Sequence, residues 1–276
     1  MTNSPDASAF IRANTALIAP PLVPEIRLFL ATEVVPLWRK TEEELEAEGV
    51  PPPYWAFAWA GGQALARYVL DHPENVAARR VLDFGSGSGL VAIAASNAGA
   101  AHVTAAEIDR FAAQAIAMNW DVNSLAPAGG EGQAEGAVPR EQRLARADAG
   151  DTGARYILED SSSGIAPSPC PLPLRGRGKE ISILAQDLID APCSWDVILV
   201  GDMCYERPLA DRLLAWLRQC VQAGATVLLG DPGRSYFPKR GVERLAVYRV
   251  RTTRELEDRE IRETGVYRFM RGAGPT

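Results

Sequence analysis

The sequence predicts an α/β fold built on a mostly parallel sheet, because strand-like and helix-like segments alternate along its middle. Apolar, strand-like runs cover residues 81–84 and 102–106, and helical apolar spacing follows them at residues 89–98 and 111–120. Strands that alternate with helices in this way form parallel sheets with right-handed crossovers.

The later part of the chain extends this sheet to seven strands. Three further strands are expected at residues 181–185, 195–200 and 225–229, with a helix at residues 209–221. Two last strand-like segments, 245–250 and 265–270, have no long helix between them and so indicate an antiparallel pair. We therefore expect a Rossmann-like sheet of five parallel strands and a C-terminal antiparallel hairpin, with helices on both faces.

The composition is that of a globular protein with an acidic balance. The chain has 276 residues, 47% of them hydrophobic, and a net charge of -6. An acidic chain repels phosphate backbones, which counts against a nucleic-acid partner. No apolar run approaches the ~20 residues of a membrane span, and the N-terminus lacks the pattern of a secretory signal. We expect a cytoplasmic monomer that binds no membrane.

The cysteines and histidines do not predict a metal site. Four cysteines and two histidines are present, namely Cys170, Cys193, Cys204, Cys220, His72 and His102. None of them forms a Cys-x-x-Cys pair or a zinc-type spacing. We expect free thiols and no metal.

A glycine-rich loop follows the first strand of the alternating region and leads into a helix. It reads Asp83-Phe84-Gly85-Ser86-Gly87-Ser88-Gly89. Glycines at alternate positions allow a sharp turn and a close backbone approach to a ligand. The dinucleotide pattern G-x-G-x-x-G fails, since its sixth position is Leu90. A carboxylate at Asp83 would repel a pyrophosphate but suits the cationic amino-acid end of S-adenosylmethionine, which favours that cofactor over NAD.

Two acidic residues after the next strands are candidates for holding the nucleoside. Glu107 lies 20 residues beyond Gly87 and is placed to accept hydrogen bonds from ribose hydroxyls. Asp109 is placed to cap the following helix, and this role is also open to Glu107. Asp187 follows the third strand, where it could accept from an adenine amino group or serve only as a helix cap.

The fourth strand ends in Gly201-Asp202-Met203-Cys204-Tyr205-Glu206. Ligands of doubly wound sheets bind beyond the carboxyl ends of strands, where the winding direction reverses. Asp202 would then face the transferred methyl group or the incoming nucleophile, and Tyr205 and Glu206 would line the acceptor side. The alternative is a strand-end turn in which a buried Asp202 is satisfied by backbone amides.

These motifs resemble the seven-β-strand protein-lysine methyltransferases, and most closely the electron transfer flavoprotein β-subunit lysine methyltransferase family. The resemblance rests on the glycine loop, the stretch ending at Asp109, Met118-Asn119-Trp120, the segment 201–206 and the Trp-rich segment 53–62. It covers residues 10–123 and 180–270. Cys204 departs from it, because relatives often carry an aromatic residue there.

The resemblance implies transfer of methyl groups from S-adenosylmethionine to lysines of a protein, expected to be the electron transfer flavoprotein β-subunit. The catalytic candidates are Asp202, Tyr205 and Glu206. The cofactor-binding candidates are Trp59, Asp83, Gly85, Ser86, Gly87, Gly89, Glu107, Ile108, Asp187 and Asp202. The alternatives are a ribosomal-protein methyltransferase or a small-molecule, nicotinamide-like N-methyltransferase whose pocket Trp55, Trp59 and Tyr205 would wall.

The domain organisation expected on this basis has two parts. Residues 1–62 form an N-terminal helical segment that covers the cofactor, with a strand-like piece at 33–38 and an acidic helix face at 42–48. Residues 63–276 form the methyltransferase domain. Within it, residues 124–178 are rich in Gly, Ala, Ser and Pro without apolar periodicity, which predicts a disordered insertion.

Overall fold

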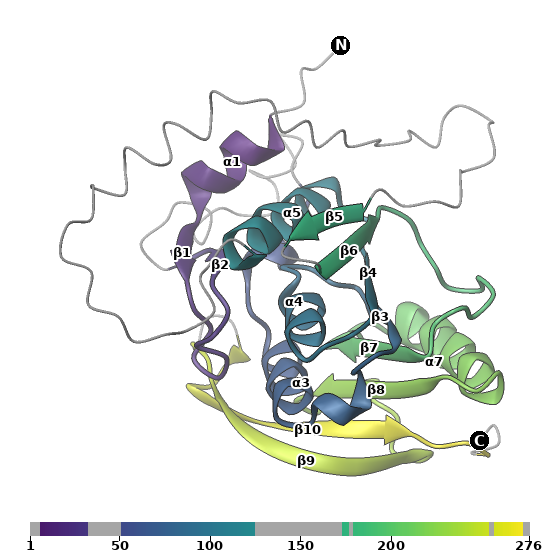
Figure 1. Cartoon of the computed structure of the whole chain (residues 1–276). Helices are drawn as coiled ribbons and strands as arrows, with labels where there is room; N and C mark the ends of the chain where they lie inside the picture. The colour runs from purple at the N-terminus through teal and green to yellow at the C-terminus, as the bar shows by residue number, and fades with distance from the viewer. Residues whose placement is uncertain (1–5, 33–50, 125–172, 177–178, 254–256, 273–276) are drawn as a thin grey trace.

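The computed structural model describes residues 6–32, 51–124, 173–176, 179–253 and 257–272, and it centres on one large sheet (Figure 1). Eight strands form this sheet, in the order β5-β6-β4-β3-β7-β8-β10-β9. Their bounds are β3 Arg80–Phe84, β4 His102–Ala106, β5 Pro173–Gly176, β6 Lys179–Leu184, β7 Val197–Gly201, β8 Thr226–Asp231, β9 Val242–Arg251 and β10 Ile261–Phe269.

The seven strands expected from the sequence are all present, with the predicted directions. β6, β4, β3, β7 and β8 pair in parallel, whereas β10 is antiparallel to both β8 and β9. Phe84 lies opposite Ala106 on one side and Val200 on the other. The loops that follow β3, β4 and β7 therefore leave the same edge of the sheet. The predicted Rossmann-like α/β class is confirmed.

The eighth strand, β5, is a correction to the sequence prediction. It lies inside the region 124–178 that we expected to be disordered, and it pairs antiparallel with β6 at the edge of the sheet. Pro173 and Gly176 are residue types depleted in strands, and proline is tolerated at a sheet edge, so this segment gave no strand signal. Residues 125–172 of the expected insertion lie outside the described residues.

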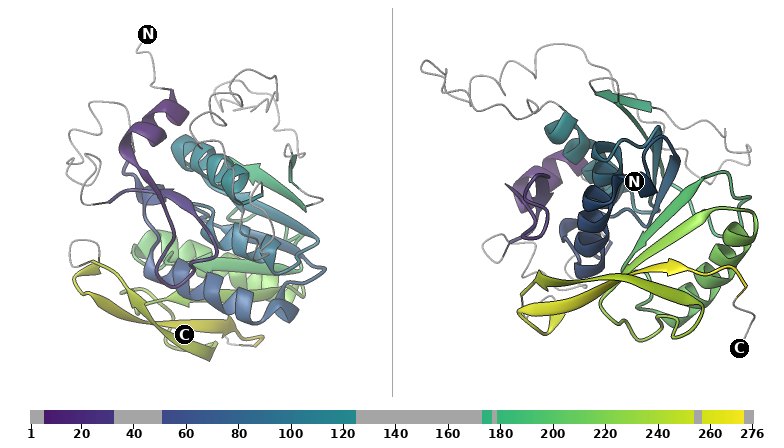
Figure 2. Two further views of the ribbon diagram at one scale, coloured as in Figure 1. Left: turned by 60° about the vertical axis from the view of Figure 1, so that its left-hand side comes forward. Right: turned by 60° about the horizontal axis from the view of Figure 1, so that its bottom comes forward.

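Helices cover both faces of the sheet, as expected (Figure 2). One face packs against α3 Ala60–Asp71, α4 Leu90–Asn97 and α5 Arg110–Ser124. The other face packs against α7 Arg207–Gln222, whose apolar side includes the fully buried Trp216. Among the described residues, no helix is long and apolar enough to cross a membrane.

The N-terminal segment is only partly helical. It consists of α1 Ala7–Asn14, an antiparallel pair of β1 Ala16–Ile18 and β2 Leu28–Leu30, and the short 3-10 helix η2 Tyr54–Ala56. The chain between β1 and β2 carries Pro20, Pro21 and Pro24, which prevent a continuous helix there. The strand and helix expected at residues 33–38 and 42–48 lie outside the described residues.

A buried asparagine ties this segment to the sheet. Asn119 of α5 accepts a hydrogen bond from the backbone N–H of Phe29 at 2.7 Å and donates one to the carbonyl of Ser88 at 2.8 Å. Phe29 belongs to β2 and Ser88 to the glycine-rich loop. One side chain, fully excluded from solvent, therefore links the N-terminal segment, α5 and that loop.

Candidate active site

The glycine-rich loop lines a hollow at the carboxyl ends of the parallel strands. Gly85, Gly87 and Gly89 have φ values of +65°, +54° and +81°, in the left-handed region that favours glycine. The hollow has a volume of about 50 Å³ and is bordered by three parts of the chain. These are residues 57–59 and 62 before and in α3, residues 83, 85–88, 90 and 91 around the glycine-rich loop, and residues 201 and 202 at the end of β7. The structure thus gathers at one place segments that are far apart in the sequence.

Asp83 lies at the base of this hollow and is buried. One of its oxygens, Oδ2, accepts hydrogen bonds from the hydroxyl of Ser86 at 2.6 Å and from the backbone N–H of Ala92 at 2.9 Å. Burial raises the pKa of Asp83 to about 7, and these two hydrogen bonds oppose the rise. The contacts show that Asp83 supports the fold of the loop as well as bordering the hollow.

Glu107 joins the ends of β3 and β4. Its carboxylate accepts from the backbone N–H of Gly87 at 3.0 Å, of Ile108 at 2.8 Å and of Asp109 at 3.3 Å. Asp109 instead accepts from the N–H of Phe111 at 2.8 Å, which is the helix-capping role expected for it. Ile108 between them is 75% exposed, an unusual position for a large apolar side chain.

Asp187 lies apart from the lining of the hollow. Its side chain accepts from the backbone N–H of Ile189 at 2.9 Å and forms an ion pair with Arg212 at 3.3 Å. About half of the side chain is exposed. These contacts are those of a turn-capping residue, and the adenine role of Asp187 stays a prediction.

Asp202 is a buried carboxylate with a left-handed backbone, φ 59°. Its Oδ2 accepts from the backbone N–H of Gly62 at 3.0 Å, and its Oδ1 accepts from Arg234 Nε at 3.0 Å and Nη2 at 2.7 Å. Burial raises the pKa of Asp202 to about 7, while the charge of Arg234 opposes the rise and that of Glu257 adds to it. Asp202 is therefore held by the side chain of Arg234 as well as by the backbone of Gly62.

Arg234 and Glu257 are site residues that the sequence reasoning missed. Glu257 is fully buried and accepts from Arg234 Nη1 at 3.0 Å and Nη2 at 2.7 Å. Arg234 follows β8 in the sequence Asp231-Pro-Gly-Arg, at the same edge of the sheet as Asp202. The sequence did carry a signal for Arg234, because it is a charged residue just beyond the carboxyl end of a parallel strand, where ligands bind. Glu257 lies in the connection between β9 and β10, where no such signal exists.

Tyr54, Trp59 and Tyr205 lie together in a group of aromatic side chains that we call the entrance, and of these three Trp59 borders the hollow with Asp202. The rings of Tyr54 and Tyr205 lie 6.1 Å apart, and that of Trp59 lies 6.2 Å from Tyr54 and 5.6 Å from the Arg234 guanidinium. Tyr54 and Tyr205 are about half exposed. Burial raises the pKa of Tyr205, and the neighbouring Tyr54 and the carboxylates of Glu206 and Glu107 raise it further. The entrance is thus aromatic and negatively charged.

Two of the sequence expectations for this entrance can be placed. Glu206 is exposed at the start of α7, and its side chain makes no capping hydrogen bond. Trp55 is buried against α5 in a cluster that includes Phe111. It is a core residue, which corrects the idea that it walls a small-molecule pocket.

Close backbone packing of glycines sets the position of Asp202 relative to α3. A Cβ atom on Gly61 would overlap the carbonyl oxygen of Gly230 and Oδ2 of Asp202, and one on Gly201 would lie 3.0 Å from Cα of Gly62. The start of α3 therefore rests directly on the ends of β7 and β8. This contact brings the N–H of Gly62 to Asp202.

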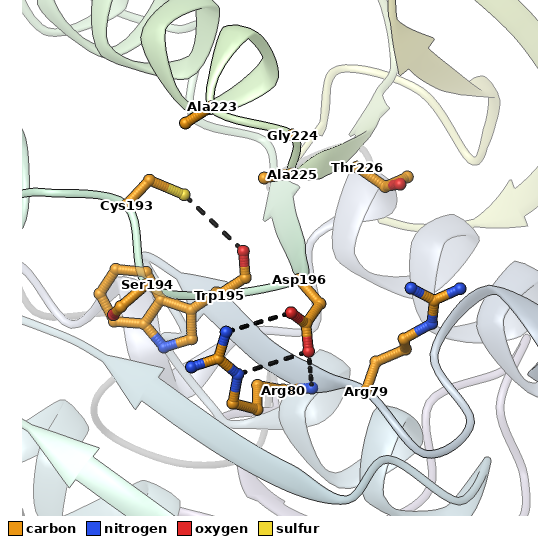
Figure 3. Close-up of a pocket in the computed structure, with 10 residues that line it drawn as sticks. All are labelled: Arg79, Arg80, Cys193, Ser194, Trp195, Asp196, Ala223, Gly224, Ala225 and Thr226. Carbon is orange, nitrogen blue, oxygen red and sulfur yellow. Dashed lines mark hydrogen bonds and ion pairs between the residues drawn. The ribbon is translucent and has the colours of Figure 1, made fainter.

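A larger hollow lies at the opposite, amino ends of the strands (Figure 3). Its volume is about 210 Å³, and it is bordered by the starts of β3, β7 and β8 and the end of α7. Arg80 and Asp196 meet there in a solvent-exposed ion pair of 3.1 Å. No described group of three His, Cys, Asp or Glu side chains could hold a metal ion there or elsewhere.

The sheet order, the glycine-rich loop and the acidic strand ends together define a Rossmann-like methyltransferase. A family model for ribosomal protein L11 methyltransferase (PrmA) matches residues 63–142. Among solved structures, ribosomal protein L11 methylase from Lactobacillus delbrueckii subsp. bulgaricus is 16% identical over 75% of this chain and 77% of that chain, with a TM-score of 0.40.

Two relatives match nearly the whole chain. The electron transfer flavoprotein beta subunit lysine methyltransferase of Danio rerio is 34% identical over 96% of this chain and 83% of that protein. The protein of the same name from Xenopus laevis is 34% identical over 95% of this chain and 86% of that protein. The chain belongs to the electron transfer flavoprotein beta subunit lysine methyltransferase family, which confirms the resemblance found in the sequence.

Proposed function

We propose that the chain transfers methyl groups from S-adenosylmethionine to lysine side chains of the electron transfer flavoprotein β-subunit. The observation that carries this proposal is the buried carboxylate of Asp202, which borders the same hollow as the glycine-rich loop. A methyl donor with a sulfonium and an acceptor with an ammonium group are both cations. A carboxylate between their two positions favours both.

The residues of the hollow fit this cofactor. S-adenosylmethionine, when bound, supplies a methyl group on a sulfonium. The left-handed glycines keep side chains off the loop, so its backbone can contact the amino-acid part. Glu107 accepts three backbone N–H groups and keeps one acceptor site, on Oε2, for a ribose hydroxyl. The proposed cofactor contacts are Trp59, Asp83, Gly85, Ser86, Gly87, Gly89, Glu107, Ile108, Asp187 and Asp202.

The N-terminal segment, residues 1–62, is proposed to cover this cofactor. Residues 57–59 border the hollow, whose volume of about 50 Å³ is small beside the ~300–1,000 Å³ of ligand pockets. We infer that these residues move outward to admit the cofactor and then exclude water from it. Exclusion of water strengthens the interaction of Asp202 with the sulfonium and with the positive charge that develops on the amine during transfer.

The entrance residues are proposed to receive the lysine. A lysine amine has a pKa near 10.4, so at pH 7 only about one molecule in several thousand is neutral and nucleophilic. Tyr54 and Tyr205 offer ring faces to the ammonium form, and Glu206 and Glu107 add negative charge beside them. Asp202 is placed to orient the amine while its proton leaves to water. Alignment of acceptor and donor supplies much of the acceleration.

The compartment and assembly state are part of the proposal. The described cysteines Cys193, Cys204 and Cys220 are free thiols, which supports a reducing, cytoplasmic environment. The net charge of -6 supports a protein substrate over a nucleic acid. We propose that the chain acts on this substrate as a monomer.

Mass spectrometry of the substrate tests the proposed function. The purified flavoprotein β-subunit is incubated with S-adenosylmethionine and either the wild type, Asp202→Asn or, as a matched control, Asp196→Asn at the other end of the sheet. We expect methylated lysines with the wild type and with Asp196→Asn, and none with Asp202→Asn. A β-subunit left unmodified by the wild type, or modified equally by Asp202→Asn, contradicts the proposal.

A further inference from the structure

The proposed function gives Arg234 no role in binding the cofactor or the acceptor. Its guanidinium lies between two buried carboxylates, those of Asp202 and Glu257, with Nη2 2.7 Å from an oxygen of each. Its backbone N–H donates to Asp231 at 2.7 Å, and the guanidinium lies 5.6 Å from the ring of Trp59. Three separate segments of the chain therefore converge on the Arg234 side chain.

The geometry of these contacts fixes the orientation of Asp202. Nε and Nη2 of Arg234 both donate to Oδ1, which uses the two acceptor sites of that oxygen. Oδ2 accepts one backbone N–H, from Gly62, and keeps a second acceptor site. Because Asp202 borders the hollow, that remaining site is available to a group that enters it. A rotated carboxylate would lose this arrangement.

The charged side chains around Asp202 differ in whether they favour or disfavour its ionised form. The ionisable side chains that influence it are Arg234 after β8, Glu257 from the β9–β10 connection and Asp231 at the end of β8, with the buried thiol of Cys204 nearby. Glu257 and Asp231 disfavour the ionised form, and Arg234 favours it. Arg262 contacts Glu257 at 3.5 Å and so balances part of that charge. Arg234 is thus the cation that opposes the burial of Asp202.

We propose that Arg234 is a positioning residue for methyl transfer, which holds the Asp202 carboxylate in one orientation and favours its ionised form for the acceptor amine. Glu257 in turn holds Arg234, so the C-terminal hairpin takes part in building the site. This inference rests on the proposed function, since it assigns Arg234 a task within the same reaction. A purely structural ion pair would also shift the pKa of Asp202 when it is lost, but it would leave kcat of the folded variant unchanged, so kcat is the measurement that distinguishes the two roles.

Two substitutions separate charge from geometry. Arg234→Gln removes the charge and leaves Glu257 in contact with Arg262, whereas Arg234→Lys keeps the charge but lacks the forked donors. Arg80→Gln, which removes an arginine from the exposed ion pair with Asp196, is the matched control. The pKa of the Asp202 carboxyl is measured by carbon-13 NMR, with its signal assigned by its absence in Asp202→Asn. Methyl transfer is measured as kcat and KM across pH.

Loss of an adjacent cation raises a carboxyl pKa by about one to three units. For Arg234→Gln we therefore expect the Asp202 pKa to rise by at least about one unit. The kcat at pH 7 should then fall about fivefold for the first unit and about tenfold for each further unit, because the wild-type pKa is about 7. The binding of S-adenosylhomocysteine should change by less than about threefold. Arg234→Lys should keep the wild-type pKa but lower kcat, with KM unchanged. Arg80→Gln should match the wild type.

The outcomes distinguish this inference from the proposed function. A wild type that transfers no methyl group overturns the proposed function, while the NMR titration still tests the effect of Arg234 on Asp202. An active wild type whose Asp202 pKa and kcat are unchanged in Arg234→Gln overturns the role of Arg234 alone. If Arg234→Gln does not fold, Arg234→Lys decides, because unchanged kcat in that variant contradicts the positioning role.

Discussion

Each of the two ends of the parallel strands carries a hollow. The two hollows differ in volume and in the burial of their charged side chains. The amino-end hollow is larger, about 210 Å³ against about 50 Å³, but its charged pair, Arg80 and Asp196, is exposed (Figure 3). The carboxyl-end hollow holds two buried carboxylates, Asp83 and Asp202, whose pKa values are raised to about 7. These buried carboxyl groups, rather than the volume of a hollow, are the reason that we propose the carboxyl end as the functional end of the sheet.

The backbone shows the same contrast. At the carboxyl end, left-handed residues are concentrated in the loop after β3 and at Asp202, and the start of α3 lies in direct backbone contact with Gly201 and Gly230. At the amino end, Gly224 has a φ of 108° at the end of α7, and a Cβ there would meet only the end of the flexible Arg271 side chain. An added side chain should therefore collide with backbone at Gly61 or Gly230, whereas at Gly224 it meets no backbone and only the left-handed φ opposes the substitution.

The largest effect is expected from Gly61→Ala. A Cβ at this position would overlap backbone of β8 and the Asp202 carboxylate, so the start of α3 must move away from the sheet. We expect a loss of stability of about 1–3 kcal/mol or more and loss of methyl transfer. Thermal unfolding and the methylation assay measure both.

The neighbouring Gly62→Ala provides the control. The nearest atom to its Cβ is Cγ2 of Val91 at 4.0 Å, and its φ is not left-handed. This variant should unfold within a few degrees of the wild type. Equal behaviour of the two alanine variants would contradict the backbone contact described at the carboxyl end.

The second effect concerns the affinity for the cofactor. Glu107→Gln keeps the size of the side chain, but its amide nitrogen cannot accept the hydrogen bonds that a carboxylate oxygen accepts. Loss of hydrogen bonds to a charged group costs about 1.5–3 kcal/mol. We expect the Kd for S-adenosylhomocysteine to rise about 10-fold to 100-fold, measured by calorimetry. An unchanged Kd would remove Glu107 from the cofactor site.

The third effect is a pH dependence of stability. The pKa of Asp83 is about 7 in the folded chain, whereas the ordinary value for an aspartate is 3.8, so the folded state binds the proton more tightly. The stability contributed by Asp83 is therefore present at low pH and is lost as the pH rises from about 4 to about 7. Asp83→Asn should be more stable than the wild type at pH 8 by about 1–3 kcal/mol, with little difference at pH 4. Denaturant unfolding at the two pH values checks this, and a difference of opposite sign would contradict it.

The smallest effect is expected at the amino end. Asp196→Asn weakens an exposed ion pair with Arg80, and such pairs contribute little to stability. Its thermal midpoint should lie within about 2 °C of the wild type, and its methylation rate should be unchanged. A clear loss of activity would place function at the larger hollow and reverse the comparison.

Most of the fold could be predicted from the sequence, because local patterns of apolar residues and glycines indicate its strands and loops. The apolar strands and the glycine loop fixed the positions of β3, β4, β7 and β8 and placed Glu107 and Asp202 at one edge. The strand β5 was missed, because Pro173 and Gly176 do not carry a strand pattern and its pairing depends on β6. The N-terminal pair β1–β2 was missed for another reason, because each of its strands has only three residues and so shows no alternating pattern.

The site was predicted less completely than the fold. Asp202 was expected from its strand end, but its partners come from other parts of the chain: Gly62 lies 140 residues away and Arg234 lies 32 residues away. Contacts between such distant residues depend on the tertiary packing of α3 and the C-terminal hairpin. A single sequence shows which residues end a strand, but not which distant side chains meet there.

Calorimetric titration of S-adenosylhomocysteine into the folded chain tests the central claim most directly. Binding at the carboxyl ends of the strands predicts one site, whose affinity falls when valine replaces Gly85 in its left-handed conformation and is unaffected by Arg80→Gln at the amino end. A folded chain that gives no binding heat, or one that binds equally well as the Gly85→Val variant, would contradict the account.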